Sequence, residues 1–354
     1  MKKIVIDPDK IDPRLVEEAA QAIIGGKVVA FSTETVYGLA ARADKAGMAE
    51  KLYALKQRPP DKAFTIALAG VGAAMDGYLS LMPPFGYRLI EKFWPGPLTI
   101  IYFSPKGDSL GLRVPSDRVG QNILARAGVP VYLPSANLSG HKDSVTAAQV
   151  ESAFDGNVDL IVDSGPCEYG RSSTVVDMTF QPFRIAREGV IPESDIVETF
   201  IRKRLTFVCT GNTCRSPMAE MLLKKYLAEQ NPFAGQRYEI ISRGIAATSG
   251  HQASGEVIEI LREKEGVDSR QFVSGRLERQ ILLSSDLIIV MEDGQKEHLL
   301  KIEPSLEGRL FTMAKFLPSD LEQDIPDPIG GSKEDYQTTY ELLRQAIMEL
   351  KDWL

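Results

Sequence analysis

The chain has 354 residues, a net charge of −7, and an ordinary composition for a folded protein, with 44% hydrophobic and 25% charged residues. This length suits two domains better than one, and apolar runs fall short of the about 20 residues that span a membrane. Three cysteines exclude a disulfide framework and favour the cytoplasm, and no Cys/His cluster has metal-ligand spacing.

The negative charge is concentrated in the second part of the chain. Residues 1–203 carry 23 basic and 24 acidic side chains, whereas residues 204–354 carry 18 and 24. Neither part has the basic excess typical of a nucleic-acid-binding protein, although a local basic cavity in the first part is compatible with these numbers.

The first part begins with a predicted helix and a buried strand. Residues 11–25 have helical spacing of apolar side chains, and residues 27–32 read as a strand. The strand runs into residues 32–39, where hydroxyls, a carboxylate and a phenol crowd a strand end. Open α/β sheets bind ligands at such ends, but this piece taken alone favours a plain threonine-rich strand edge.

A second helix is predicted over residues 48–57, and it stops at two prolines. Lys56 and Arg58 stand at its end and form either a rigid cationic corner or a solvated helix terminus. Further groups rich in Gly, Pro, Ser and Asn follow, each of which alone fits an ordinary turn or cap. They occupy residues 93–99, 111–115, 135–140, 172–177 and 185–189.

Taken together and in this order, these motifs resemble the YrdC domain family of threonylcarbamoyl-AMP synthases. They read Thr-Glu-Thr-Val-Tyr-Gly-Leu, Lys-Gln-Arg-Pro, Trp-Pro-Gly-Pro-Leu-Thr, Leu-Arg-Val-Pro, Ser-Ala-Asn-Leu-Ser-Gly and Ser-Thr-Val-Val-Asp. The resemblance covers about residues 10–192 and implies a twisted mixed sheet with helices around a concave cavity. It also implies a reaction that joins L-threonine, bicarbonate and ATP with release of pyrophosphate.

The resemblance further implies that Mg²⁺ accompanies ATP and that partner proteins use threonylcarbamoyl-AMP to modify adenosine 37 of tRNA. It assigns two groups of residues: Lys56, Arg58, Ser135, Asn137, Ser144 and Arg187 for ATP, and Thr33, Arg113 and Ser173 for threonine. Arg113 is the expected partner of the threonine carboxylate. The alternative is a module that only binds nucleotide or RNA and regulates its neighbour.

A short, stiff connection is expected between a first domain at residues 1–192 and a second at residues 204–354. The linker, residues 193–203, should contain a helix from about 193. The second domain alternates strands and helices, which predicts a doubly wound parallel sheet. The strands are expected at 205–208, 238–242, 287–291 and 309–313, and the helices at 216–229, 253–266, 293–302 and 333–352.

The sequence Cys209-Thr-Gly-Asn-Thr-Cys-Arg-Ser-Pro lies between the first of these strands and a helix start. Backbone amides at a helix start favour an anion, and Arg215 supplies a planar fork for two phosphate oxygens. Positive surroundings favour the thiolate of Cys209, which is the nucleophilic form. The loop resembles the signature of the low-molecular-weight protein tyrosine phosphatase family, whose enzymes use no metal cofactor.

This resemblance gives Cys209 the role of nucleophile, Arg215 that of phosphate ligand, and Asp327, in an Asp-Pro pair, that of general acid. Asp324 is the nearest competitor for the acid. Asn212 should keep a left-handed backbone and be braced by Ser242, and Cys214 could trap oxidised Cys209 or simply pack. Thr210, Gly211, Thr213 and Ser216 are the other residues expected to form the phosphate-binding loop.

Three substrates compete for the second domain. The loop resembles that of bacterial protein-arginine phosphatases, which carry a threonine at Thr213, whereas tyrosine phosphatases usually carry an aliphatic residue there. A hydroxyl can bond a guanidinium, so we favour a phosphoarginine protein over a phosphotyrosine protein. Arsenate reduction would need two cysteines after Cys214, and the sequence has none.

Overall fold

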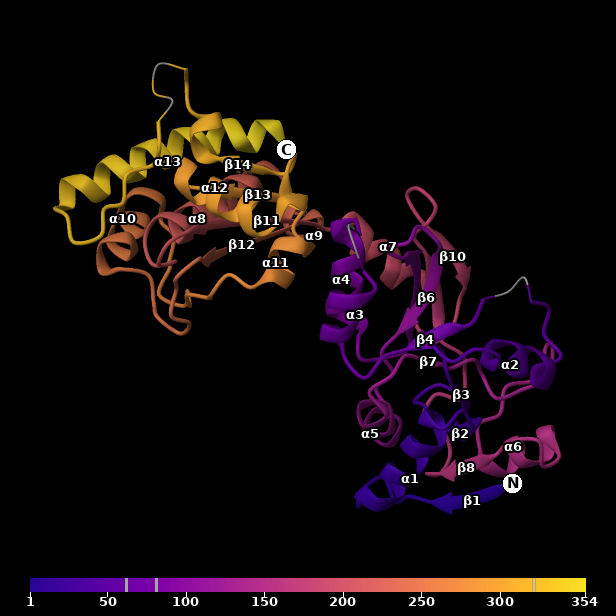
Figure 1. Ribbon diagram of the computed structural model, residues 1–354. Coiled ribbons are helices and arrows are strands. Elements are labelled where there is room, and N and C mark those ends of the chain that lie inside the picture. The colour runs from indigo at the N-terminus through magenta and orange to yellow at the C-terminus, as the bar shows by residue number, and fades with distance from the viewer. Residues whose placement is uncertain (61–62, 80–81, 320, 322) are drawn as a thin grey trace. The chain divides into compact units, whose positions relative to one another are not determined.

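The computed structural model describes residues 1–60, 63–79, 82–319, 321 and 323–354. The chain forms two compact units (Figure 1): unit 1 contains Met1–Met82 and Arg88–Val197, and unit 2 contains Pro83–Tyr87 and Glu198–Leu354. Two helices, α4 (Pro84–Phe93) and α7 (Glu193–Ile201), contain residues of both units. No helix of the described residues is long and apolar enough to cross a membrane.

Unit 1 is built on a ten-stranded sheet with the order β1-β8-β2-β3-β7-β4-β6-β5-β9-β10, in which parallel and antiparallel pairs are mixed. Its strands are β1 (Lys2–Val5), β2 (Val29–Phe31), β3 (Gly38–Arg42), β4 (Thr65–Ala67), β5 (Leu98–Phe103), β6 (Ser109–Arg113), β7 (Val131–Tyr132), β8 (Leu160–Asp163), β9 (Thr174–Asp177) and β10 (Arg184–Arg187). Its other helices are α1 (Pro13–Ile24), α2 (Met48–Lys56), α3 (Val71–Gly77), α5 (Arg118–Ala127) and α6 (Ala147–Phe154).

Alternation of side chains along β2 explains why this sheet has helices on both faces. Val29 and Phe31 pack with residues of α1 and α5, whereas Val28 and Ala30 pack with residues of α2 and α6. Successive side chains of a strand point to opposite faces, so a run that is apolar throughout needs a cover on each side. The mixed α/β fold expected for this part is confirmed.

Unit 2 is a four-stranded, all-parallel sheet with the order β12-β11-β13-β14. Its strands are β11 (Lys203–Cys209), β12 (Tyr238–Gly244), β13 (Leu287–Val290) and β14 (Leu310–Thr312). Its helices are α8 (Arg215–Gln230), α9 (Ala234–Arg237), α10 (Gly255–Glu265), α11 (Arg279–Ser284), α12 (Asp293–Ile302) and α13 (Lys333–Trp353), with 3₁₀ turns η1 (Pro304–Leu306) and η2 (Met313–Phe316).

The two faces of this smaller sheet again follow the strand period. Phe207 and Ile289 belong to a core shared with α8, α10 and α13, whereas Val208 and Val290 pack with residues of α11 and α12. The doubly wound parallel sheet is therefore confirmed. In such sheets ligands bind beyond the carboxyl ends of the strands, and β11 ends at Cys209.

Candidate active sites

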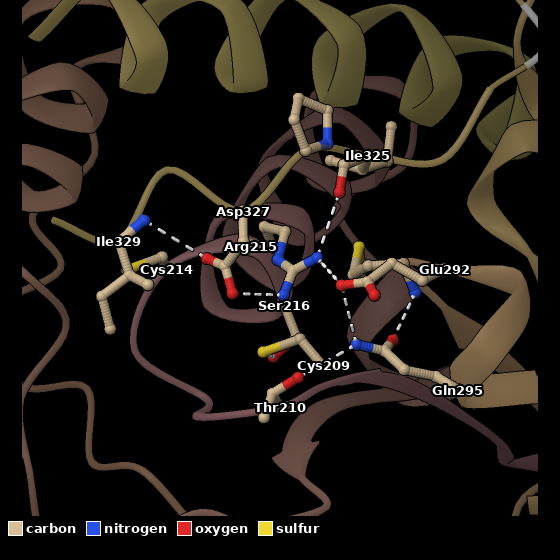
Figure 2. A network of polar contacts seen from close by, with 12 residues as sticks. Cys209, Thr210, Cys214, Arg215, Ser216, Glu292, Gln295, Ile325, Asp327 and Ile329 are labelled. Carbon is tan, nitrogen blue, oxygen red and sulfur yellow. Dashed lines mark hydrogen bonds and ion pairs between the residues drawn. The ribbon is translucent and has the colours of Figure 1, made fainter. Parts of the chain in front are cut away.

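Cys209, at the end of β11, lies among the polar side chains drawn in Figure 2. It is only 3% exposed, and its Sγ accepts a hydrogen bond from the backbone N–H of Asn212, in the loop before α8, at 3.2 Å. The Ser216 hydroxyl lies 3.0 Å from the same sulfur. Helix α8 begins at Arg215, so the positive end of its dipole also faces this loop.

Asn212 fixes the shape of the loop through its backbone and its amide. Its φ is +56°, in the left-handed region that asparagine tolerates better than most residues. Its Nδ2 donates to the hydroxyls of Ser216 and Ser242, both at 2.9 Å, and its Oδ1 accepts from the N–H of Gly275 at 2.8 Å. Because Ser216 accepts from Asn212, its own hydroxyl proton is available to Cys209, where it can stabilise a thiolate.

Arg215, at the start of α8, is almost wholly buried, with 1% of the residue exposed. Its Nη1 donates to a carboxylate oxygen of Glu292 and, at 3.1 Å, to the carbonyl of Ile325. Its Nη2 donates to Asp327 Oδ2 at 2.5 Å. The Nε has no hydrogen-bond partner among the described residues. A buried donor without an acceptor is costly, so an anion in this loop would satisfy it.

The two candidate acids occupy different places. Asp327 accepts a hydrogen bond from the guanidinium of Arg215 through Oδ2. Its Oδ1 accepts a second one from the N–H of Ile329 at 3.3 Å. Asp324 instead accepts a hydrogen bond from the N–H of Asp293 at 2.9 Å, at the start of α12. The position of Asp327 beside the cysteine loop therefore suits an acid for that loop better than the position of Asp324 does.

The remaining loop residues have distinct surroundings. Thr210 Oγ1 accepts from Gln295 Nε2 at 3.3 Å. Among the described residues, Thr213 Oγ1 makes one polar contact, a long one of 3.7 Å with the sulfur of Cys214, so it is available to a ligand. Cys214 is 3% exposed, and its sulfur lies 3.6 Å from the hydroxyl of Ser254. Gly211 brings no side chain into the loop.

Sequence reasoning missed Glu292 and Gln295. Both follow β13, the neighbour of β11 in the parallel sheet, and so lie at the same edge as Cys209. Ligand sites form at the carboxyl ends of strands in such sheets, and this rule could have drawn attention to the Met-Glu-Asp-Gly-Gln stretch after β13.

Unit 1 contains a cavity of about 760 Å³ lined by polar and cationic side chains. Six of the nine residues expected to bind substrates line it: Thr33, Arg58, Arg113, Ser135, Ser173 and Arg187. Several residues that were not expected line it as well, among them Asp177 and Arg184, which form an ion pair at 2.8 Å. Arginines from separate segments thus meet at one cavity, which suits a polyanionic ligand.

The other three expected residues are buried and do not line the cavity. Lys56 is 2% exposed, and its Nζ donates to the carbonyl of Ser135 and, at 2.7 and 3.1 Å, to the carbonyl and Oδ1 of Asn137. The Ser144 carbonyl accepts from the N–H of Tyr37 at 2.8 Å. In this structure Lys56 therefore holds the 135–137 loop beside the cavity.

The free energy of unfolding of unit 1 should depend on pH through the titration of Lys56. Burial lowers the pKa of Lys56 to about 8 from 10.5, and the charge of Arg58 acts in the same direction. Between these two values the unfolded chain binds more protons, so stability should rise with pH. Relative to Lys56→Met, the wild type should gain about 3 kcal/mol across this window.

This prediction can be measured by urea unfolding in a Trp353→Phe background, where Trp94 of unit 1 is the one remaining tryptophan. Lys51→Met, an exposed lysine on the same helix, is the matched control and should leave the pH profile unchanged. Parallel profiles for the wild type and Lys56→Met would contradict the prediction.

Arg113 is held from one side and open on the other. Its Nη2 donates to Glu34 Oε1 and Thr35 Oγ1, both at 2.8 Å, and its Nε donates to the carbonyl of Gly96 at 3.3 Å. Among the described residues none accepts a bond from Nη1. Glu34, which the motif reading did not single out, is 3% exposed and supplies the counter-charge.

Arg187 and Ser173 are joined within the same cavity. Arg187 donates to the carbonyl and hydroxyl of Ser173 at 3.0 and 3.1 Å, and that hydroxyl lies 2.9 Å from the hydroxyl of Thr99. Burial lowers the pKa of Arg187 below its ordinary value. The cost of burying this cation would be reduced by an anionic ligand.

The folds and sites define two classes in one chain: a mixed α/β unit around a cationic cavity, and a doubly wound unit with a cysteine-centred anion loop. A family model described as telomere recombination (Sua5, YciO and YrdC) matches residues 21–189, and one described as low molecular weight phosphotyrosine protein phosphatase matches residues 204–354. The chain belongs to the threonylcarbamoyl-AMP synthase family through its first part and to the low-molecular-weight phosphatase family through its second.

Individual relatives match one part each. The chain is 33% identical to a putative threonylcarbamoyl-AMP synthase of Mycobacterium tuberculosis, over 54% of this chain and 91% of that protein. It is 36% identical to the low molecular weight protein-tyrosine-phosphatase PtpB of Staphylococcus haemolyticus, over 42% of this chain and 97% of that protein.

The match to the threonylcarbamoyl-AMP synthase of Pyrococcus abyssi is 32% identical over 53% of this chain, and it spans 58% of that protein's length. A crystal structure of P. abyssi Sua5 with L-threonine has a TM-score of 0.54 at 21% identity, covering 88% of this chain and 99% of that one, which is a likeness of fold.

Proposed function

We propose that the chain is a bifunctional enzyme: unit 1 makes threonylcarbamoyl-AMP, and unit 2 is a cysteine-dependent protein phosphatase that favours phosphoarginine. Membership of the two families supports this pair of activities. The observation that supports the proposal is that six of the nine residues expected to bind substrates in unit 1 line one cavity, and that the loop after β11 in unit 2 directs a backbone N–H at Cys209.

In unit 1 the amine of L-threonine attacks the carbon of bicarbonate, and water leaves to give a carbamate. A carbamate oxygen then attacks the α-phosphorus of ATP and pyrophosphate departs. Arg113 pairs with the threonine carboxylate, and Arg58 and Arg187 face the phosphates. Mg²⁺ enters with ATP as part of the substrate complex and spreads its charge.

Nucleotide turnover tests the synthase against the alternative, a module that binds nucleotide or RNA and only regulates. The purified chain should convert ATP to threonylcarbamoyl-AMP and pyrophosphate only when both threonine and bicarbonate are present. ATP binding without such turnover would favour the regulatory module. The product would be consumed by partner proteins that modify tRNA.

In unit 2 the thiolate of Cys209 attacks phosphorus and forms a thiophosphate, while Arg215 and the loop amides hold the equatorial oxygens. Asp327 protonates the leaving group and then accepts a proton from the attacking water. As drawn in Figure 2, Asp327 still binds Arg215, so the phosphate must take over that guanidinium before the acid can act.

Thr213 is the basis for preferring phosphoarginine. Its hydroxyl makes no short hydrogen bond within the loop and can accept one from a guanidinium. Thr213→Ile should move the ratio of kcat/KM values, phosphoarginine over phosphotyrosine, about 10-fold or more toward phosphotyrosine. The measurement is phosphate release from both substrates side by side, with Cys209→Ser as the blank. An unchanged ratio would remove the argument for phosphoarginine.

A further inference from the structure

The guanidinium of Arg215 has two sides with different partners. On one side Nη1 is bound by Glu292 and by the carbonyl of Ile325. On the other side Nε has no partner among the described residues, and Nη2 contacts only Asp327. The Nε and Nη2 atoms form the edge of a guanidinium that can bind two phosphate oxygens in parallel.

We infer that Glu292 is a positioning residue that fixes this orientation and thereby aims the Nε–Nη2 edge at the phosphate. The inference rests on the proposed phosphatase function of unit 2. Glu292 lies on the Nη1 side, away from the edge that would bind phosphate, and so acts through Arg215. It also supplies a counter-charge to the buried side chain of Arg215, which is 2% exposed.

Glu292 is itself held in place by the neighbouring helix (Figure 2). Gln295, one turn further along α12, donates its Nε2 to both Glu292 Oε1 and Thr210 Oγ1 at 3.3 Å. The side-chain oxygen of Gln295 accepts from the N–H of Met291 at 3.0 Å. The Gln295 amide therefore links Glu292 to Thr210, the first residue of the loop after Cys209. This link fixes the position of the carboxylate relative to the loop.

This arrangement separates two effects that a change at Glu292 would have. Without Glu292 the guanidinium of Arg215 can rotate. If its Nε–Nη2 edge turns away from the phosphoryl group, it no longer binds two phosphoryl oxygens in the transition state, and the reaction is slower. Binding of an anion in the ground state need not weaken, because Arg215 keeps its charge and one nearby negative charge is gone. Loss of kcat without loss of phosphate binding is therefore the signature of positioning.

The test uses the full chain and p-nitrophenyl phosphate, a substrate that does not depend on the phosphoarginine preference. Glu292→Ala should lower kcat about 100-fold, while inhibition by inorganic phosphate stays within about 3-fold of the wild type or becomes tighter. Glu292→Gln should recover much of kcat, because its amide oxygen still accepts from Nη1. Glu297→Ala, which removes an exposed carboxylate of α12, the helix that follows Glu292, is the matched control and should leave kcat unchanged.

Two results would overturn the inference. A kcat within about 3-fold of the wild type in Glu292→Ala would show that the orientation of Arg215 does not need Glu292. A parallel loss of kcat and phosphate inhibition, with no recovery in Glu292→Gln, would show that Glu292 only maintains the loop. A wild type that hydrolyses neither this substrate nor phosphoproteins is a different result, because it refutes the proposed phosphatase itself.

Discussion

Cys209→Ser should abolish phosphate release by unit 2, with a loss of about 10⁴-fold or more, because removing the nucleophile of a covalent mechanism costs at least this much. A serine hydroxyl is only slightly smaller than the thiol but is not ionised at neutral pH. The N–H of Asn212 and the hydroxyl of Ser216 would still point at the substituted oxygen, so the loop should keep its shape.

Two other cysteines provide matched controls for this experiment. Cys214→Ser changes the same loop by the same atom, and Cys167→Ser changes a cysteine of unit 1. Both variants should keep most of the phosphatase activity, and Cys209→Ser should keep the synthase activity of unit 1. If Cys214→Ser is as inactive as Cys209→Ser, the assignment of the nucleophile is wrong.

Arg113→Ala should raise the KM for L-threonine in unit 1 about 100-fold, while the affinity for ATP stays within about 3-fold, since a charge-assisted hydrogen bond from a guanidinium to a carboxylate contributes up to about 3 kcal/mol. The expected ligand atom is Nη1, because Nη2 and Nε are bound by Glu34, Thr35 and Gly96. The measurement is ATP turnover at varied threonine, beside nucleotide titration of the same protein.

Loss of Arg113 would also leave Glu34 buried without its cation, which destabilises a protein strongly. The double variant Arg113→Ala/Glu34→Gln removes both charges and is expected to fold as well as the wild type. It should still show the raised KM for threonine. A normal threonine KM in the double variant would contradict the role of Arg113 in holding the carboxylate.

Much of the fold could be predicted because its signals are local. The helix expected at 333–352 is α13, and the strand expected at 287–291 is β13. Apolar periodicity and flanking turn residues act over a few positions, so they survive without knowledge of the rest of the chain. Short elements such as α11 and β10 were missed, since a few residues carry too little periodic signal.

The cysteine loop was also readable from sequence, since residues 209–216 are consecutive and a strand end, a turn and a helix start bring them around one point. The same local reasoning predicted a left-handed backbone for Asn212, and its φ of +56° confirms this. Lys56 shows what this local logic does not reach. It ends helix α2, and its ammonium group is bound by oxygens 79 to 81 residues further along the chain, contacts that its neighbours in sequence do not indicate.

The sequence by itself determined the two families, the order of their domains and the identity of the loop that surrounds Cys209. Only the tertiary structure decided which groups surround Arg215: Glu292 and Asp327 lie 77 and 112 residues away along the chain. The physical reason is that a buried cation is satisfied by whatever acceptors the parallel sheet brings to its carboxyl edge, and strand order is not written in any one segment.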